Sequence, residues 1–311
     1  MRGMLNGRVA ILNGFGISLG DGIIGLSALR AAQLLGVAQD CVLFRGAGSP
    51  MLDALYREAR AFAPTAPMDA FRADAFDGVI DIRDFAFDPA FRGMAMIDFF
   101  LMRLGVDVAS VPPAGRRNVW LGERMRPARG GGYVLVCPRS SMALRDMPPA
   151  IHAGIVRTLG ETQDLAILTQ GPAVGGARSV APKDDLAGLC ALVAGAGLMV
   201  STDTAMVHLA DAFDVPCLAL FTTHRPVWRV RDYPTVRAVH LPADLPEALE
   251  FSRGAEDLAA VAAAWHAGAG EIEAAVRRFA GRFTPGRKHG ALPRTPPGAE
   301  PLDLGLVTNG F

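Results

Sequence analysis

Residues with chemical capability gather at two turns of the sequence, and the first turn begins at Asp203 and Thr204. The apolar run at residues 197–200 predicts a short buried strand before it, and Asp and Thr are residue types that commonly begin helices. The helix would carry His208 about one turn from its start. Backbone N–H groups at a helix start bind anions such as phosphate. This turn is therefore a candidate phosphate site.

The second turn is a glycine-rich loop at residues 14–22, after a predicted strand at 9–13 and before a predicted helix at 23–35. Glycines such as Gly20 allow the backbone to approach a ligand closely, and Asp21 places an ionisable group where loop becomes helix. The spacing Gly-x-Gly-x-x-x-Gly is one residue longer than the dinucleotide fingerprint. No acidic residue ends the next predicted strand, so the pattern disfavours NAD.

Strand-like and helix-like segments alternate around both turns, which predicts two parallel, helix-covered α/β domains of the doubly wound, Rossmann-like kind with a ligand cleft between them. Predicted strands lie at 9–13, 41–44, 79–82, 133–137, 165–169, 198–201 and 217–221, and predicted helices at 23–35, 52–62, 94–104, 149–159, 184–196, 205–213, 256–266 and 271–283.

Four segments follow from this alternation. Residues 1–130 form an N-terminal domain that ends in a linker rich in Pro, Gly and Arg, and residues 131–270 form the second domain. A helix at 271–283 closes the fold, and an irregular tail occupies 284–311.

The overall composition restricts the classes of partner. The 311 residues carry 31 basic and 31 acidic side chains, and this zero net charge gives no general attraction for nucleic acid. The start of the chain has no apolar segment of the secretory kind, no apolar run approaches the ~18 residues that span a bilayer, and the four cysteines show no paired spacing. We therefore expect a cytoplasmic protein. Arginines at 116–129 leave open a phosphorylated acceptor or the inner membrane surface, with a solvated linker as the plainer interpretation.

These residues resemble glycosyltransferase family 9, the family of ADP-heptose:lipopolysaccharide heptosyltransferases of GT-B fold. The most specific likeness runs from Asp203 to His208 and into the Val-Pro strand at 215–221; Ala205 stands where relatives often have Gly. The loop at 18–22 is similar to the family's Gly-Asp loop. A third likeness lies at 138–148, which looks like the family's diphosphate loop.

The resemblance implies roles for individual side chains. Asp21 would be the general base on the acceptor hydroxyl, although capping a helix is the ordinary role of Asp at such a place. Hydroxyls at Ser140 and Ser141 and the cation of Arg145 would stabilise the departing diphosphate, for which loop solvation is the alternative. His208 would contact the donor, although an apolar helix face more often holds a core histidine.

The resemblance also implies inversion and independence from metal, and no other cofactor is expected. It implies further that the helix at 271–283 crosses back to pack on the first domain. We therefore expect a GT-B glycosyltransferase that moves a sugar, with heptose from ADP-heptose as the leading donor, to a lipopolysaccharide, another glycan or a lipid-linked acceptor. The substrate-binding residues would be Gly20, Ser140, Ser141, Asp203, Thr204, Ala205 and His208, with Asp21 and Arg145 as catalytic residues.

Alternatives remain open at this stage: a transferase or epimerase that uses another nucleotide sugar, and a non-catalytic nucleotide-sugar-binding protein. A nicotinamide oxidoreductase is the weakest of them. The stretch 224–229 is either part of the nucleotide pocket or a solvated loop.

Overall fold

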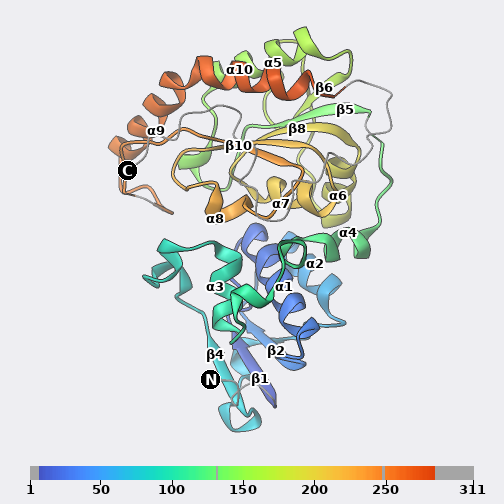
Figure 1. Ribbon diagram of the computed structural model, residues 1–311, viewed down its shortest axis with the longest axis vertical. Coiled ribbons are helices and arrows are strands. Elements are labelled where there is room, and N and C mark those ends of the chain that lie inside the picture. Colours follow the sequence, from blue (N-terminus) through green and yellow to red (C-terminus); the bar gives the residue numbers. More distant parts are fainter. Residues whose placement is uncertain (1–6, 131, 247–248, 284–311) are drawn as a thin grey trace. The chain divides into compact units, whose positions relative to one another are not determined.

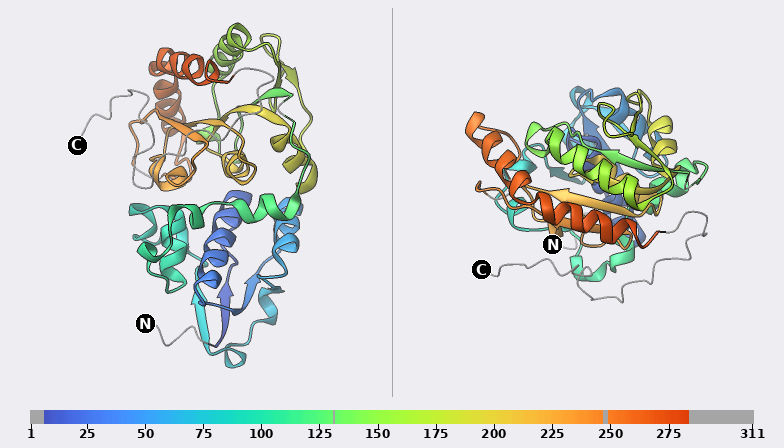
Figure 2. Two further views of the ribbon diagram at one scale, coloured as in Figure 1. Left: turned by 45° about the vertical axis from the view of Figure 1, so that its right-hand side comes forward. Right: turned by 90° about the horizontal axis from the view of Figure 1, so that it is seen from above.

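A computed structural model describes residues 7–130, 132–246 and 249–283 (Figures 1 and 2). The described chain divides into two compact units. The first contains the residues up to Pro127 together with Lys183–Cys190, and the second contains Ala128–Pro182 and the residues from Ala191 onward. The tail that the sequence predicts to be irregular, 284–311, lies outside the described residues.

The first unit contains a four-stranded parallel sheet in the order β3-β2-β1-β4. Its elements are β1 (Arg8–Leu12), α1 (Leu19–Leu34), β2 (Asp40–Arg45), α2 (Pro50–Ala59), β3 (Thr65–Pro67), β4 (Gly78–Asp81), α3 (Met96–Arg103) and α4 (Val119–Met125), with short 3-10 turns between several of them. The helix α4 lies within the predicted linker, where Arg124 forms an ion pair of 2.8 Å with Glu58.

The second unit contains a six-stranded parallel sheet in the order β10-β9-β8-β5-β6-β7. Its elements are β5 (Tyr133–Cys137), α5 (Pro149–Thr162), β6 (Ala166–Thr169), β7 (Arg178–Ser179), β8 (Ala196–Thr202), α7 (Ala205–Ala212), β9 (Cys217–Phe221), α8 (Val227–Val230), β10 (Val236–His240), α9 (Ala255–Ala267) and α10 (Ala269–Ala280). The helix α6 (Leu186–Ala194) crosses the boundary between the two units.

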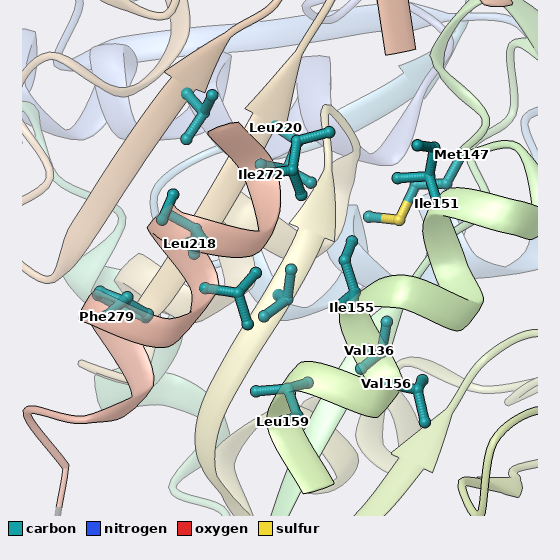
Figure 3. Packing of buried hydrophobic residues seen from close by; sticks show 14 of the residues in the cluster. Val136, Met147, Ile151, Ile155, Val156, Leu159, Leu218, Leu220, Ile272 and Phe279 are labelled. Carbon is teal, nitrogen blue, oxygen red and sulfur yellow. The ribbon is translucent and has the colours of Figure 1, made fainter. Parts of the chain in front are cut away.

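The core of the second unit joins α5 and α10 over one face of the sheet (Figure 3). Ile272, Val276 and Phe279 lie on the buried side of α10 and pack with Ile155 and Leu218. These buried residues recur every three or four positions, which is the period of an amphipathic helix. The sequence predicts a helix at 271–283, which is present as α10 (Ala269–Ala280) and packs in the core of the second unit. The crossing back to the first domain that the resemblance implies stays a prediction.

The order of strands fixes where each sheet can hold a ligand. In the second unit, β8 follows β5, β6 and β7 along the chain but pairs with the opposite edge of β5, so the winding direction reverses between β5 and β8. In the first unit the same reversal lies between β1 and β4. Ligands of open parallel sheets bind outside the carboxyl ends of the strands at such a reversal. The loops after β1 and after β5 and β8 therefore lie where a ligand of each sheet would bind.

The loop after β1 has an unusual backbone. Asn13, Gly14, Phe15 and Gly16 all have positive φ angles, of 80°, 57°, 65° and 91°. This conformation costs a bulky residue such as Phe15 free energy, which burial of its ring offsets: the ring packs edge-on against Phe100 with centroids 5.2 Å apart. The tight loop carries the chain from the end of β1 to the start of α1.

Candidate anion-binding site in the second unit

The loop after β5 folds on itself through its own polar groups. Asp146 accepts a hydrogen bond of 2.7 Å from the backbone N–H of Ser140 and pairs with Arg139 at 2.8 Å. The Ser140 hydroxyl accepts from the backbone N–H of Met142 at 2.9 Å, while Ser141 is exposed. The hydroxyl of Ser140 thus organises the loop, and Ser141 presents its side chain to the surface.

Two threonines attach this loop to the neighbouring strands. Thr202, the last residue of β8, donates from its hydroxyl to the carbonyl of Arg145, and Thr222, directly after β9, donates to the carbonyl of Leu144 at 3.1 Å. Both threonines are buried. Because three consecutive parallel strands hold it, the loop places Arg145 at the carboxyl end of the sheet, where the winding direction reverses.

Arg145 lies among charged side chains from distant parts of the sequence. Its guanidinium Nη2 pairs with Glu250 Oε2, and its Nε lies 3.6 Å from Asp203 Oδ2. The other oxygen of Glu250 is 3.0 Å from His224 Nε2 and 3.1 Å from Arg229 Nη2. We call these five residues, Arg145, Asp203, His224, Arg229 and Glu250, the charge cluster. It contains two guanidinium groups, two carboxylates and one imidazole.

Burial controls the charges in the cluster. Burial lowers the pKa of His224, and the positive charge of Arg229 lowers it further, so that the ring is neutral at neutral pH. Burial acts to raise the pKa of Glu250, but the hydrogen bond from His224 and the charges around it prevail and hold that pKa well below its ordinary value. The cluster therefore carries two positive and two negative charges at neutral pH.

Asp203 has an unsatisfied acceptor inside this cluster. The residue is 4% exposed, and its Oδ2 atom has no hydrogen-bond partner among the described residues. Arg145 Nε lies 3.6 Å and His224 Nδ1 3.5 Å from this atom. A buried carboxylate oxygen without a donor costs free energy. A ligand hydroxyl could donate to this atom, so Asp203 is suited to hold a polar ligand.

The helix start predicted at Asp203 and Thr204 is present. Thr204 occupies the N-cap position of α7, with Ala205 as the first helical residue, but the Thr204 side chain makes no capping hydrogen bond. The capping role proposed for these side chains is therefore absent.

His208 is a buried residue of α7. Its Nδ1 atom lies 2.9 Å from the hydroxyl of Tyr233, and burial lowers its pKa to about 4. This environment is that of a core histidine, the alternative that the sequence left open. Contact between His208 and the sugar-nucleotide donor stays a prediction.

In the first unit, Asp21 occupies the third position of α1 in a reciprocal capping box. The backbone N–H of Asp21 donates to the Ser18 hydroxyl at 3.1 Å, and Asp21 Oδ2 accepts from the backbone N–H of Ser18 at 3.3 Å. Asp21 is partly exposed, and Gly20 before it is buried. Capping is thus a real role of Asp21, and its role as a base stays a prediction.

The structure brings Arg145 and Asp203 together, as the resemblance implies for a donor site, and it adds Glu250 to them. His224 and Arg229 are 0% and 9% exposed, so the interpretation of 224–229 as a solvated loop is wrong for these two residues. The sequence gives no signal for Glu250, because it lies between β10 and α9 in a stretch without periodicity.

Within residues 7–130, 132–246 and 249–283, no group of three or more His, Cys, Asp or Glu side chains is arranged to hold a metal ion. No helix in this part of the chain is both long and apolar enough to cross a bilayer.

Comparison with known proteins gives a family match over part of the chain and identifies structures of similar fold. Residues 151–254 match the family model of glycosyltransferase family 9 (heptosyltransferase). This segment includes Asp203, His208 and Glu250, while Asp21 and Arg145 lie outside it. No curated protein matches the chain.

Solved heptosyltransferases share the fold of nearly the whole chain. TibC from enterotoxigenic E. coli H10407, a dodecameric iron-containing heptosyltransferase solved with ADP-D-beta-D-heptose, aligns with a TM-score of 0.60 and 13% identity over 89% of this chain and 78% of TibC. E. coli heptosyltransferase WaaC with ADP aligns with a TM-score of 0.51 and 18% identity over 78% of this chain and 96% of WaaC. E. coli ADP-heptose lps heptosyltransferase II aligns with a TM-score of 0.52 and 12% identity over 86% of this chain and 99% of that enzyme. The predicted α/β fold of GT-B type is confirmed, as is the family resemblance over residues 151–254.

Proposed function

We propose that this glycosyltransferase, which carries its family 9 segment at residues 151–254, moves a sugar from a nucleotide diphosphate donor to the hydroxyl of a glycan or lipid-linked acceptor. The leading donor is ADP-heptose, and lipopolysaccharide is the leading acceptor. Transfer inverts the anomeric carbon and needs no metal; both statements rest on the family resemblance. The observation that carries the proposal is the position of Arg145 beside Asp203 at the winding reversal of the second sheet.

The chemistry of the donor explains why this pair is suitable. As the bond between sugar and diphosphate breaks, negative charge grows on the leaving phosphate, and a fixed guanidinium stabilises that charge. The unsatisfied Asp203 oxygen is suited to accept from a sugar hydroxyl. Ser140, Ser141, the backbone at Thr204 and Ala205, and His208 are the further residues that we assign to donor binding.

The acceptor side of the reaction is assigned to the first unit. Asp21 would take the proton of the acceptor hydroxyl while its oxygen attacks the anomeric carbon, and Gly20 would allow close approach. The attack forms one glycosidic bond, the diphosphate leaves with the electron pair of the broken bond, and the proton remains on Asp21 until solvent removes it.

Support for adenine as the base comes from relatives alone, because TibC and WaaC were solved with ADP-D-beta-D-heptose and ADP. Thermal unfolding with ADP, UDP, GDP, NAD and NADP tests the assignment, since a ligand of the folded state raises the melting temperature. We expect stabilisation by ADP. Stabilisation by UDP or GDP instead would change the donor, and stabilisation only by NAD or NADP would reject a transferase.

A second experiment separates a transferase from a binding protein or an epimerase. ADP-heptose is incubated with the protein, with and without deacylated lipopolysaccharide that lacks heptose, after exhaustive treatment with EDTA. ADP release that depends on the acceptor and survives the chelator supports metal-independent transfer. Isomerised sugar nucleotide without ADP would indicate an epimerase, and binding without any product would indicate a non-catalytic protein.

A further inference from the structure

Glu250 is the point on which three hydrogen-bond donors of the charge cluster converge. Its Oε2 atom meets Arg145, and its Oε1 atom meets His224 at 3.0 Å and Arg229 at 3.1 Å. Because the ionised Glu250 carboxylate can only accept, His224 Nε2 donates to it, and the Thr223 hydroxyl, 3.1 Å from Nδ1, donates to the other ring nitrogen. Two guanidinium groups and an imidazole N–H around one carboxylate form the kind of donor set that also binds a phosphate group.

This donor set cannot bind a phosphate group while the Glu250 carboxylate occupies it, because the charges of the cluster are already balanced. With His224 neutral, Arg145 and Arg229 are balanced by Asp203 and Glu250. A diphosphate that entered this neutral cluster would bring two or more negative charges next to two carboxylates. Withdrawal of Glu250 alone would leave the cluster with one net positive charge and three donors directed at the vacated position.

Glu250 is the carboxylate that can leave. Its side chain is 24% exposed, whereas that of Asp203 is 6% exposed and lies directly after β8 in the interior of the sheet. Glu250 belongs to the connection between β10 and α9, and the next residue, Phe251, is 55% exposed. A connecting segment at the surface can shift without disturbing the sheet, but the end of β8 cannot.

We infer that Glu250 fills the phosphate position of the ligand-free site and that the diphosphate of the donor displaces it from Arg145, Arg229 and His224. This inference rests on the proposed function and adds two side chains, Arg229 and His224, to those that bind the diphosphate. The displaced carboxylate competes with ligand, so it weakens binding of any nucleoside diphosphate and favours release of the product diphosphate after transfer.

The test compares the wild-type protein with Glu250→Gln by calorimetric titration with ADP and with inorganic pyrophosphate, which needs no nucleobase contact. The amide keeps the size of the side chain and loses its charge. We expect at least threefold tighter binding of both probes by Glu250→Gln. Glu273→Gln is the matched control, because Glu273 is a carboxylate of the same unit that pairs with Arg157 away from the cluster, at 2.6 Å.

The possible outcomes distinguish the inference from the proposed function. Equal or weaker binding of both probes by a folded Glu250→Gln protein overturns the inference alone. If neither ADP nor pyrophosphate binds to the wild-type protein, the proposed function is overturned and the inference with it. If the variant does not fold, a crystal structure of wild type with pyrophosphate decides: a phosphate on Arg145 with Glu250 withdrawn supports displacement, and an intact Arg145–Glu250 pair beside the bound ligand rejects it.

Discussion

The hydroxyl of Thr202, at the end of β8, donates a hydrogen bond to the main-chain carbonyl of Arg145, in the loop that follows β5. The two residues are 57 positions apart in the sequence, and their strands are neighbours in the sheet. The contact fixes the backbone of the arginine, while its side chain meets the charge cluster. Through Thr202 the sheet itself positions the cation that we assign to the diphosphate.

This relationship predicts the effect of Thr202→Val. Valine keeps the shape of the buried side chain but lacks the hydroxyl that donates to the Arg145 carbonyl. We expect a loss of about 1–2 kcal/mol in the free energy of unfolding, measured by denaturant titration, and a severalfold rise in the Kd for ADP. Thr222→Val, which removes the analogous bond to Leu144, is the matched control and should lose stability with a smaller change in Kd. Equal changes in Kd for both variants would contradict a particular role of Thr202.

The base assignment is tested with Asp21→Asn. An amide can still accept the hydrogen bond from Ser18 but cannot take a proton, so turnover should fall ~100-fold or more while ADP affinity stays close to wild type. Ser18→Ala is the control, because it breaks the capping box and leaves the carboxylate. That variant should lose about 1 kcal/mol of stability and keep most of its activity at a temperature below unfolding. Near-normal turnover in Asp21→Asn would leave Asp21 with its capping role alone.

The elements that the sequence predicts best are those with strong local signals. The strands at Tyr133–Cys137 and Cys217–Phe221 have the predicted bounds, because each is a continuous apolar run between residues that break structure. Three short strands were not predicted. β3 and β7 have three and two residues at sheet edges, and β10 contains Arg237, a buried arginine whose guanidinium donates to the carbonyls of Pro234 and Val236. The arginine interrupts the apolar run by which a buried strand is predicted.

Residues of the candidate site also differ in whether the sequence around them carries a local signal. Asp203 and Asp21 were singled out because each lies where a predicted strand or glycine-rich loop leads into a helix, whereas Arg145 was singled out through the family resemblance. Glu250 was not predicted, since its partners Arg145 and His224 lie 105 and 26 residues away and no motif surrounds it. The pairing of Arg145 with two carboxylates also could not be derived from the loop sequence, which shows the cation and not the groups that neutralise it.

Acid should destabilise the protein earlier than its carboxylates alone would require. Burial lowers the pKa of His208 to about 4, so the folded protein keeps this ring neutral while the unfolded chain binds a proton below about pH 6.5. The unfolded state then binds more protons, and stability falls as the pH decreases through this window, by about 2 kcal/mol from this residue at about pH 5.

The measurement is the free energy of unfolding of wild type and His208→Gln between about pH 8 and pH 5. Glutamine does not titrate and can still bond with the Tyr233 hydroxyl, so its stability should depend less steeply on pH. Parallel pH profiles for the two proteins would show that His208 does not contribute. His266→Gln serves as the control for loss of a histidine, because His266 is an exposed residue in the last turn of α9.

Arg145→Ala tests the assignment of the diphosphate loop. The guanidinium attracts the diphosphate in the ground state and more strongly as charge develops, so ADP affinity and turnover should both fall, each by about tenfold or more. The control is Arg139→Ala in the same loop, because Arg139 is 62% exposed and pairs with Asp146 rather than with the charge cluster. It should bind ADP and turn over within about threefold of wild type, the range typical of an exposed ion pair. If Arg139→Ala were the more damaging change, the diphosphate would bind at the outer side of the loop and not beside Asp203; if neither change altered ADP affinity, the loop after β5 would have no part in donor binding.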